Sequence, residues 1–203
     1  MSRSLVIATG NAGKLKEIQQ ILAPFQWQVR SQKEFAISDA DETGLSFVEN
    51  AILKARHACA HTGLPALADD SGLEVDALQG APGIYSARYS GADATDVRNN
   101  EKLLEALRDV PEMQRTARFQ CVMVLMRHAA DPTPLICQGT WEGRIVFAPA
   151  GNNGFGYDPL FWVESQGCTS AQLDAATKNR LSHRGQALLK LADAMQASSV
   201  WRT

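Results

Sequence analysis

Two adjacent carboxylates, Asp69 and Asp70, are the residues of this sequence whose type and spacing most clearly suggest chemistry. The apolar residues 65–68 before them predict a short buried strand, and Ser71-Gly72 predicts the point where the backbone leaves it. Like charges so close repel each other, and burial makes the charged form costlier still. A hard cation such as Mg²⁺, bound through one or two carboxylates, relieves that repulsion. The alternative is a surface turn, because Asp, Ser and Gly favour turns for local reasons.

A second stretch, Thr9-Gly10-Asn11-Ala12-Gly13-Lys14, has the composition of a phosphate-binding loop. The apolar residues 5–8 before it predict a strand, and the helical spacing of the apolar residues after it predicts a helix. Backbone N–H groups at a helix start attract anions, and the lysine adds a full positive charge. The Walker spacing G-x-x-x-x-G-K-[ST] is absent, which excludes that type of loop. A plain strand-to-helix turn is the alternative.

An acidic stretch at residues 39–44 precedes a predicted helix that opens with a capping box, Ser46 with Glu49. Acidic loops followed by a lysine are usually solvated surface. In a functional interpretation, Glu42 is a metal ligand and Lys54 is a phosphate contact, both beside the strand of Asp70.

Residues 149–159 combine glycine and asparagine with two aromatic residues, Phe155 and Tyr157. A loop whose backbone can approach closely and that carries aromatic rings is suited to holding a flat ring. A long surface hairpin is the alternative.

Three cations, Lys178, His183 and Arg184, cluster around the predicted start of the last helix, with Ser182 as the expected N-cap. Cations at the positive end of a helix dipole are unfavourable unless an anion or an acceptor-rich group joins them. This combination therefore favours a binding function.

The 203 residues and the formal net charge of −2 suit one globular domain, or two lobes around one cleft. The charge balance does not favour nucleic-acid binding, which needs a basic face. The four cysteines form no C-x-x-C pair, which is typical of reduced thiols in a cytoplasmic protein. We see no signal peptide and no membrane-spanning run. A buried strand at residues 119–126, followed by a returning strand over 135–147, predicts a mixed sheet.

Together these motifs resemble the inosine/xanthosine triphosphate pyrophosphatase family, and the likeness to its bacterial dITP/XTP branch is close. The resemblance covers nearly the whole chain in the right order. It rests on five stretches, namely residues 9–14, 42–51, 68–72, 154–159 and 182–185.

This resemblance implies an α/β fold with an elongated mixed β-sheet and flanking helices, arranged as two lobes around a central cleft within one domain, residues 1–203. It implies a homodimer, and the composition leads us to expect a cytoplasmic protein with no membrane or nucleic-acid partner. It also implies Mg²⁺-dependent hydrolysis of dITP, ITP and XTP to the monophosphate and pyrophosphate. That activity would cleanse the nucleotide pool and keep deaminated purines out of DNA and RNA.

The resemblance assigns roles to individual residues, and the residue chemistry adds Lys54 and Asp69 to them. Asp70 is the expected catalytic base, and Asp70, Glu42 and Asp69 are the expected metal ligands. The expected substrate-binding residues are Thr9, Gly10, Asn11, Ala12, Gly13, Lys14, Lys54, Ser71, Phe155, Gly156, Tyr157, Asp158, Lys178, His183 and Arg184. Because consecutive strand residues point to opposite faces, Asp69 and Asp70 share one site fully only if the strand ends between them.

Two other functions remain open from the sequence. A related pyrophosphatase acting on modified pyrimidines would use similar chemistry. A non-catalytic nucleotide-binding regulator would need the phosphate loop and the ring pocket, but it would have no need of an acidic metal cluster.

Overall fold

The computed structural model describes residues 3–23 and 27–201, and its contacts group the chain into two compact units. Unit 1 takes the described residues of segments 1–70, 121–139 and 184–203. Unit 2 takes segments 71–120 and 140–183. Each unit is therefore assembled from stretches that are far apart in the sequence.

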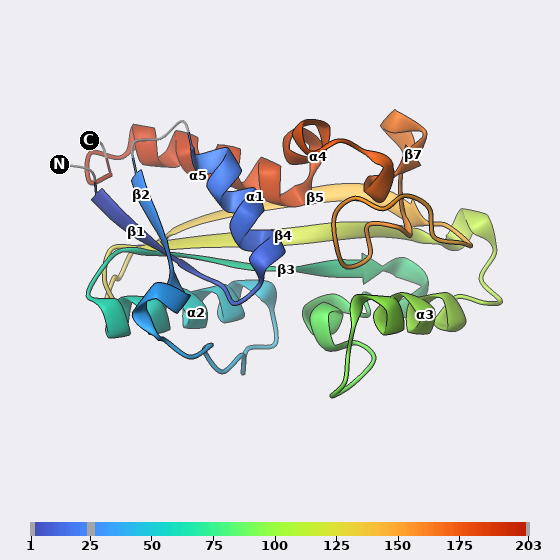
Figure 1. The fold of residues 1–203 in the computed structure, drawn as a ribbon, viewed down its shortest axis with the longest axis horizontal. Helices are drawn as coiled ribbons and strands as arrows, with labels where there is room; N and C mark the ends of the chain where they lie inside the picture. Colours follow the sequence, from blue (N-terminus) through green and yellow to red (C-terminus); the bar gives the residue numbers. More distant parts are fainter. Residues whose placement is uncertain (1–2, 24–26, 202–203) are drawn as a thin grey trace. The chain divides into compact units, whose positions relative to one another are not determined.

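A mixed β-sheet with flanking helices forms the framework of the fold, as predicted (Figure 1). The strands are β1 (Arg3–Ala8), β2 (Trp27–Ser31), β3 (Ala66–Val75), β4 (Thr116–Met126), β5 (Leu135–Ile145), β6 (Phe161–Val163) and β7 (Cys168–Thr169). Their order in the sheet is β2-β1-β3-β4-β5-β6-β7. Strand β1 pairs in parallel with β2 and β3, whereas β6 pairs antiparallel with β5 and β7.

Five α-helices lie in the described part of the chain: α1 (Ala12–Leu22), α2 (Phe47–Thr62), α3 (Asp96–Ala106), α4 (Ala175–Leu181) and α5 (His183–Ala197). None of the helices in residues 3–23 and 27–201 is long and apolar enough to cross a membrane. The predicted N-cap of α2 is confirmed, because the Ser46 hydroxyl accepts from the backbone N–H of Glu49. The Glu49 carboxylate accepts from the Ser46 hydroxyl and from the backbone N–H of Leu45. Ser182, the expected N-cap of the last helix, lies between α4 and α5: it is the C-cap of α4 and directly precedes His183, the first residue of α5.

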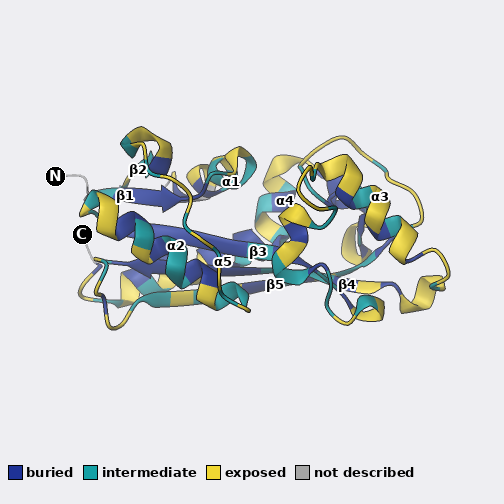
Figure 2. Ribbon diagram, turned by 90° about the horizontal axis from the view of Figure 1, so that it is seen from below, coloured by how far each residue is buried: buried dark blue, intermediate teal, exposed yellow. Residues whose placement is uncertain are grey.

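In unit 1 the two faces of the sheet pack against different helices. Leu5 and Ile7 of β1 lie in one apolar cluster with residues of α1 and α5. Val6 and Ala8, which alternate with them, lie in a second cluster with residues of α2. Alternation along a strand thus decides which helix each side chain meets. Residues 5–8 of β1 and the unit 1 parts of β3 and β4 are buried on both faces (Figure 2), whereas β2 and β5 are partly exposed.

Unit 2 has an apolar core of its own. Leu73 of β3, Phe119 of β4 and Ile145 of β5 pack with Leu103 of α3 and with the segment around Phe161. This core supports the loop that joins β5 to β6, which the sequence predicted to hold a ring.

The predicted end of the central strand at Ser71-Gly72 is wrong. Strand β3 continues without interruption from Ala66 to Val75. The pairing with β1 covers only Ala66 to Ala68, and β3 continues past it in a sheet whose next strand is β4, so its place in the sheet overrides the local turn preference of Ser71-Gly72. Asp69 and Asp70 therefore lie in the middle of a strand and point to opposite faces.

Candidate active site

Asp70 belongs to a carboxylate–lysine cluster on the α2 side of the sheet in unit 1. Its Oδ1 atom lies 2.6 Å from Nζ of Lys54, a residue of α2, and the same Nζ atom lies 3.0 Å from Oε1 of Glu42. The three residues that the sequence placed around a metal and a phosphate are thus brought together. One lysine charge faces two carboxylates, so the cluster is net negative when both are ionised.

Burial shapes the protonation of this cluster. Burial raises the pKa of Asp70, and the positive charges of Lys54 and Lys14 offset that effect only in part. Burial alone would lower the pKa of Lys54, but the charges of Asp70 and Glu42 outweigh it and raise that pKa. The lysine therefore keeps its proton, while Asp70 holds a proton more readily than an exposed aspartate does.

The residues present here fit a magnesium ion. Oδ2 of Asp70 is buried, and no described residue forms a hydrogen bond with it. A buried, unsatisfied carboxylate oxygen is costly without a donor or a cation, and Mg²⁺ prefers oxygen ligands from one or two carboxylates plus substrate phosphates. Among the described residues no group of three or more His, Cys, Asp or Glu side chains could hold a metal.

Asp69 faces the other side of the sheet, toward α1 and α5. Its Oδ1 atom lies 2.6 Å from Nζ of Lys14, and its Oδ2 atom lies 3.1 Å from Nε of Arg184 and accepts from the Cys121 thiol at 3.0 Å. Burial would raise the pKa of Asp69, but the positive charges of Arg184 and Lys14 outweigh it and hold that pKa well below the usual range. The geometry thus ties Asp69 to the lysine of the phosphate loop, whereas its direct binding to a metal stays a prediction.

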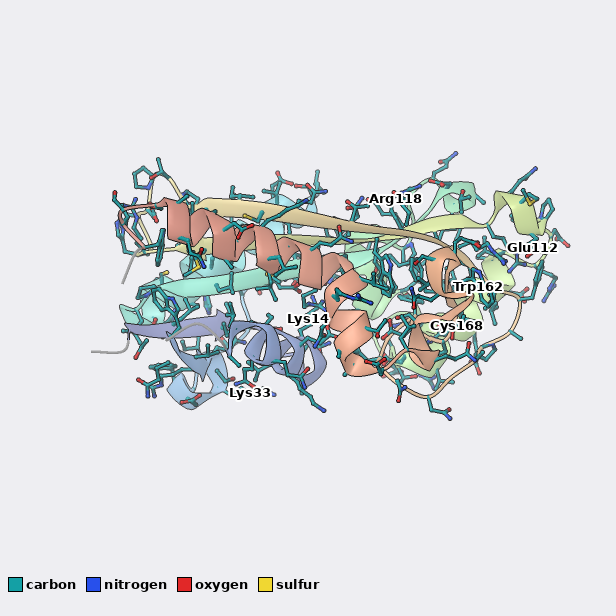
Figure 3. All side chains as sticks on the ribbon, turned by 90° about the horizontal axis from the view of Figure 1, so that it is seen from above. Lys14, Lys33, Glu112, Arg118, Trp162 and Cys168 are labelled. Atoms are coloured by element: carbon teal, nitrogen blue, oxygen red, sulfur yellow. The ribbon has the colours of Figure 1, made fainter. Side chains whose placement is uncertain are left out.

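The predicted phosphate loop has the expected strand–turn–helix form. Thr9 follows β1, Asn11 is the N-cap of α1, and its side chain accepts from the backbone N–H of Lys14 at 3.0 Å. The Thr9 hydroxyl accepts from the backbone N–H of Asn11 at 3.2 Å. Gly10 lies in the turn, Ala12 and Gly13 are the first two residues of α1, and Figure 3 labels Lys14, the third. Backbone N–H groups in the first helical turn have no partner within the helix, so they suit an anion.

In unit 2, Asp158 organises the predicted ring-binding loop. Its Oδ2 atom lies 2.6 Å from Nζ of Lys178 and accepts from the backbone N–H of Phe155 at 2.9 Å, and its Oδ1 atom accepts from the Ser170 hydroxyl at 2.8 Å. The Lys178 ammonium lies 4.9 Å from the centre of the Phe155 ring. A cation and an aromatic face are thus set side by side, both positioned by one buried carboxylate.

A model of the Ham1 family matches residues 5–194 of this sequence, a range that contains every candidate site residue. The chain belongs to the Ham1 family. It is 60% identical over 194 residues to the dITP/XTP pyrophosphatase of Escherichia coli O157:H7, covering 96% of this chain and 98% of that protein. It is 59% identical to the dITP/XTP pyrophosphatase of Vibrio cholerae, with 96% and 97% covered. A HAM1 protein from Coxiella burnetii has a solved structure with a TM-score of 0.90 to this chain at 50% identity, covering 97% of this chain and all of that one.

Within this Ham1-family chain the predicted site residues form two sets, one in each unit. Residues 9–14, Glu42, Lys54, Asp69, Asp70 and Arg184 lie in unit 1, and Ser71, residues 155–158, Lys178 and His183 lie in unit 2. The ionic contacts described above join members of the same set. Ser71 is the strand residue that follows Asp70 on β3.

Two predicted contacts have a different setting from the one expected. Tyr157 is only 4% exposed, and its hydroxyl donates to the backbone carbonyl of Ser86, so its ring belongs to the core of unit 2. His183 is buried and stacks on Phe119, with ring centres 4.8 Å apart and planes 12° from parallel. The sequence predicted Phe119 only as part of the buried strand at residues 119–126, and it gave no signal for this contact with His183.

Gly154 allows a test of how the ring loop is built, with Gly156 as a matched control. Both have positive φ, 77° and 63°, but a Cβ on Gly154 would stand 2.0 Å from Oδ2 of Asp158, whereas one on Gly156 would meet nothing within 4 Å. We expect Gly156→Ala to lower the free energy of unfolding by about 1 kcal/mol, the cost of a left-handed residue. Gly154→Ala should cost about 1 to 2 kcal/mol more, because Asp158 must move. Urea unfolding measures both, and equal losses would contradict the close contact.

Proposed function

We propose that this chain hydrolyses dITP, ITP and XTP to the nucleoside monophosphate and pyrophosphate in a Mg²⁺-dependent reaction. It would thereby keep deaminated purines out of the nucleotide pool of the cytoplasm. The observation that carries the proposal is Asp70, a buried carboxylate with one oxygen on Lys54 and the other without a hydrogen-bond partner among the described residues. Membership of a family whose relatives are named dITP/XTP pyrophosphatases supports the same substrate class.

Glu42 and Asp70 would hold the magnesium ion, which supplies positive charge that offsets the charge of the phosphates. Asp70 orients the attacking water and accepts its proton, for which a carboxyl with a raised pKa is well suited. The water oxygen bonds to the α-phosphorus, and the bond to the bridging oxygen of the β-phosphate breaks. Lys14, Lys54 and the first-turn N–H groups of α1 stabilise the charge on the departing pyrophosphate.

The unit 2 set would recognise the base. Phe155 offers an aromatic face, and Lys178 beside it offers a donor for the O6 acceptor of hypoxanthine or xanthine. Adenine presents a 6-amino donor instead of an acceptor, so the buried donor of Lys178 would have no acceptor on the base. A site built on hydrogen bonds rejects such an analogue by roughly 10⁴-fold or more.

The decisive experiment incubates the purified chain with Mg²⁺ and a panel of canonical and deaminated triphosphates. We expect pyrophosphate and monophosphate from dITP, ITP and XTP, with slow turnover of dATP and dGTP. In ¹⁸O-labelled water the label should enter the monophosphate, because attack is at the α-phosphorus. Release of orthophosphate and a diphosphate would contradict this geometry, and binding without turnover would favour a nucleotide-binding regulator. We also propose a homodimer, which light scattering of the purified chain tests directly.

A further inference from the structure

Helix α3 holds both backbone polar groups of Gly156, the residue between Phe155 and Tyr157. The carboxylate of Asp96 accepts from the Gly156 N–H at 2.7 Å, and the side-chain amide of Asn100 donates to the Gly156 carbonyl at 2.8 Å. Asp96 and Asn100 are four residues apart on α3, so they lie one above the other on one helix face.

The local structure of α3 leaves Asp96 available for this contact. Thr95 is the N-cap, and its hydroxyl accepts from the backbone N–H of Arg98 at 3.2 Å. Asp96 is the first helical residue, and it is not needed as the cap. Its charge makes the bond to Gly156 stronger than a neutral one. Asn100 is held by a second donation, to the backbone carbonyl of Asp96 at 2.7 Å.

An unsatisfied acceptor lies at the same place. Oδ1 of Asn100 is buried, and no described residue donates to it. Buried acceptors without a donor are costly, so Asn100 serves something other than the stability of α3. Its amide nitrogen donates to the backbone of the loop that carries Phe155.

The hydrogen bonds from Asp96 and Asn100 fix the loop at Gly156, a residue whose lack of a side chain gives its backbone the most freedom. Gly156 has φ of 63°, and a Cβ there would meet nothing, so side-chain packing at this residue does not hold the loop. On one side, Phe155 is held through its N–H by Asp158, and on the other, Tyr157 is held through its hydroxyl by Ser86. With the two hydrogen bonds from α3 to Gly156, residues 155, 156 and 157 are each held by hydrogen bonds.

We propose that Asp96 and Asn100 are positioning residues for base recognition, which set the Phe155 ring beside Lys178 in the geometry that receives a purine. The inference rests on the proposed function, because it assigns the ring of Phe155 to the base. A binding site must hold its groups within about 0.5 Å of the productive geometry, so a displaced Phe155 ring should bind the base more weakly. The effect should therefore fall on ligands that carry a base and spare ligands that do not.

The test compares Asp96→Ala with Asp96→Asn, which keeps an acceptor for the Gly156 N–H, and with Glu101→Ala, which removes an exposed acid from the same helix. Calorimetry measures binding of dIMP and of inorganic pyrophosphate, and kinetics with dITP give kcat and KM. We expect Asp96→Ala to weaken dIMP binding and raise KM by about tenfold, with kcat and pyrophosphate binding within about twofold of wild type. Asp96→Asn and Glu101→Ala should bind dIMP nearly as wild type does.

Two outcomes would overturn the proposal. Unchanged dIMP binding in a folded Asp96→Ala variant would show that the Asp96–Gly156 hydrogen bond has no part in base recognition. An equal loss of affinity for dIMP and pyrophosphate would show a general structural effect. Asn100→Ala, which removes the other bond, gives an independent second variant if Asp96→Ala unfolds. A wild-type chain that fails to hydrolyse dITP would instead refute the proposed function, so the two failures are distinguishable.

Discussion

Replacing Asp70 by asparagine is expected to lower turnover of dITP by at least about 100-fold, the lower range for loss of a positioned acid–base group. The variant keeps the shape of the side chain and an oxygen for Lys54, but it cannot take a proton from water. It also removes the charge that would hold the magnesium ion. Steady-state kinetics of the purified variant measure the loss. Asp41→Asn, which neutralises an exposed acid beside Glu42, is the matched control and should retain nearly full activity.

The same substitution should not destabilise the metal-free chain. Burial raises the pKa of Asp70, so the folded state binds this proton more tightly than the unfolded state. Stability from this group is therefore present at low pH and is lost as pH rises from the unfolded pKa through the higher folded pKa. Because the neutral side chain avoids that loss, Asp70→Asn should unfold at the same or a higher temperature at pH 7. Near-normal turnover, or a variant that fails to fold, would contradict this assignment.

The sequence predicted the local parts of the fold and site well. The apolar run before residues 9–14 and the helical spacing after them predicted β1, the loop and α1, because each signal lies within a few residues. The predicted association of Glu42, Lys54 and Asp70 is also confirmed as a geometric fact. Residues on a loop, a helix and a strand meet there because the apolar residues of α2 pack on the sheet face to which Asp70 points.

What the sequence missed depends on partners that are distant along the chain. Turn-forming residues predicted that the strand ends at Ser71, but β3 continues to Val75 beside β4, and Asp69 and Asp70 point to opposite faces. The hydrogen bond between Asp96 and Gly156 joins residues 60 positions apart, and no sequence spacing predicts such a pair. An aspartate after a threonine at a helix start is usually assigned to capping, so its role in another loop is invisible before folding.

Arg184 was predicted to contact the substrate, but its side chain is buried in ion pairs with other residues of the protein. We therefore expect Arg184→Ala to lose much stability. Its side chain is 2% exposed, and it forms ion pairs with Asp69, whose side chain is fully buried, and with Glu17 of α1. Removing one partner of a buried ion pair typically costs about 3 to 5 kcal/mol, because the other charge stays buried. For a chain of this size the loss corresponds to a decrease in Tm of about 10 °C.

Thermal unfolding of Arg184→Ala, with exposed Arg180→Ala as the charge-matched control, measures this loss. Arg184→Lys should recover only part of the stability, because one ammonium does not reproduce the fork that reaches two carboxylates. An unchanged Tm in Arg184→Ala would contradict the buried network. Contact between Arg184 and the base stays a prediction, and kinetics at a temperature where the variant is folded test it separately. If the difference in kcat/KM between dITP and dGTP becomes smaller in Arg184→Ala, Arg184 also selects the base. If kcat/KM falls by the same factor for both substrates, the base is selected by Phe155, Lys178 and the α3 residues that position them.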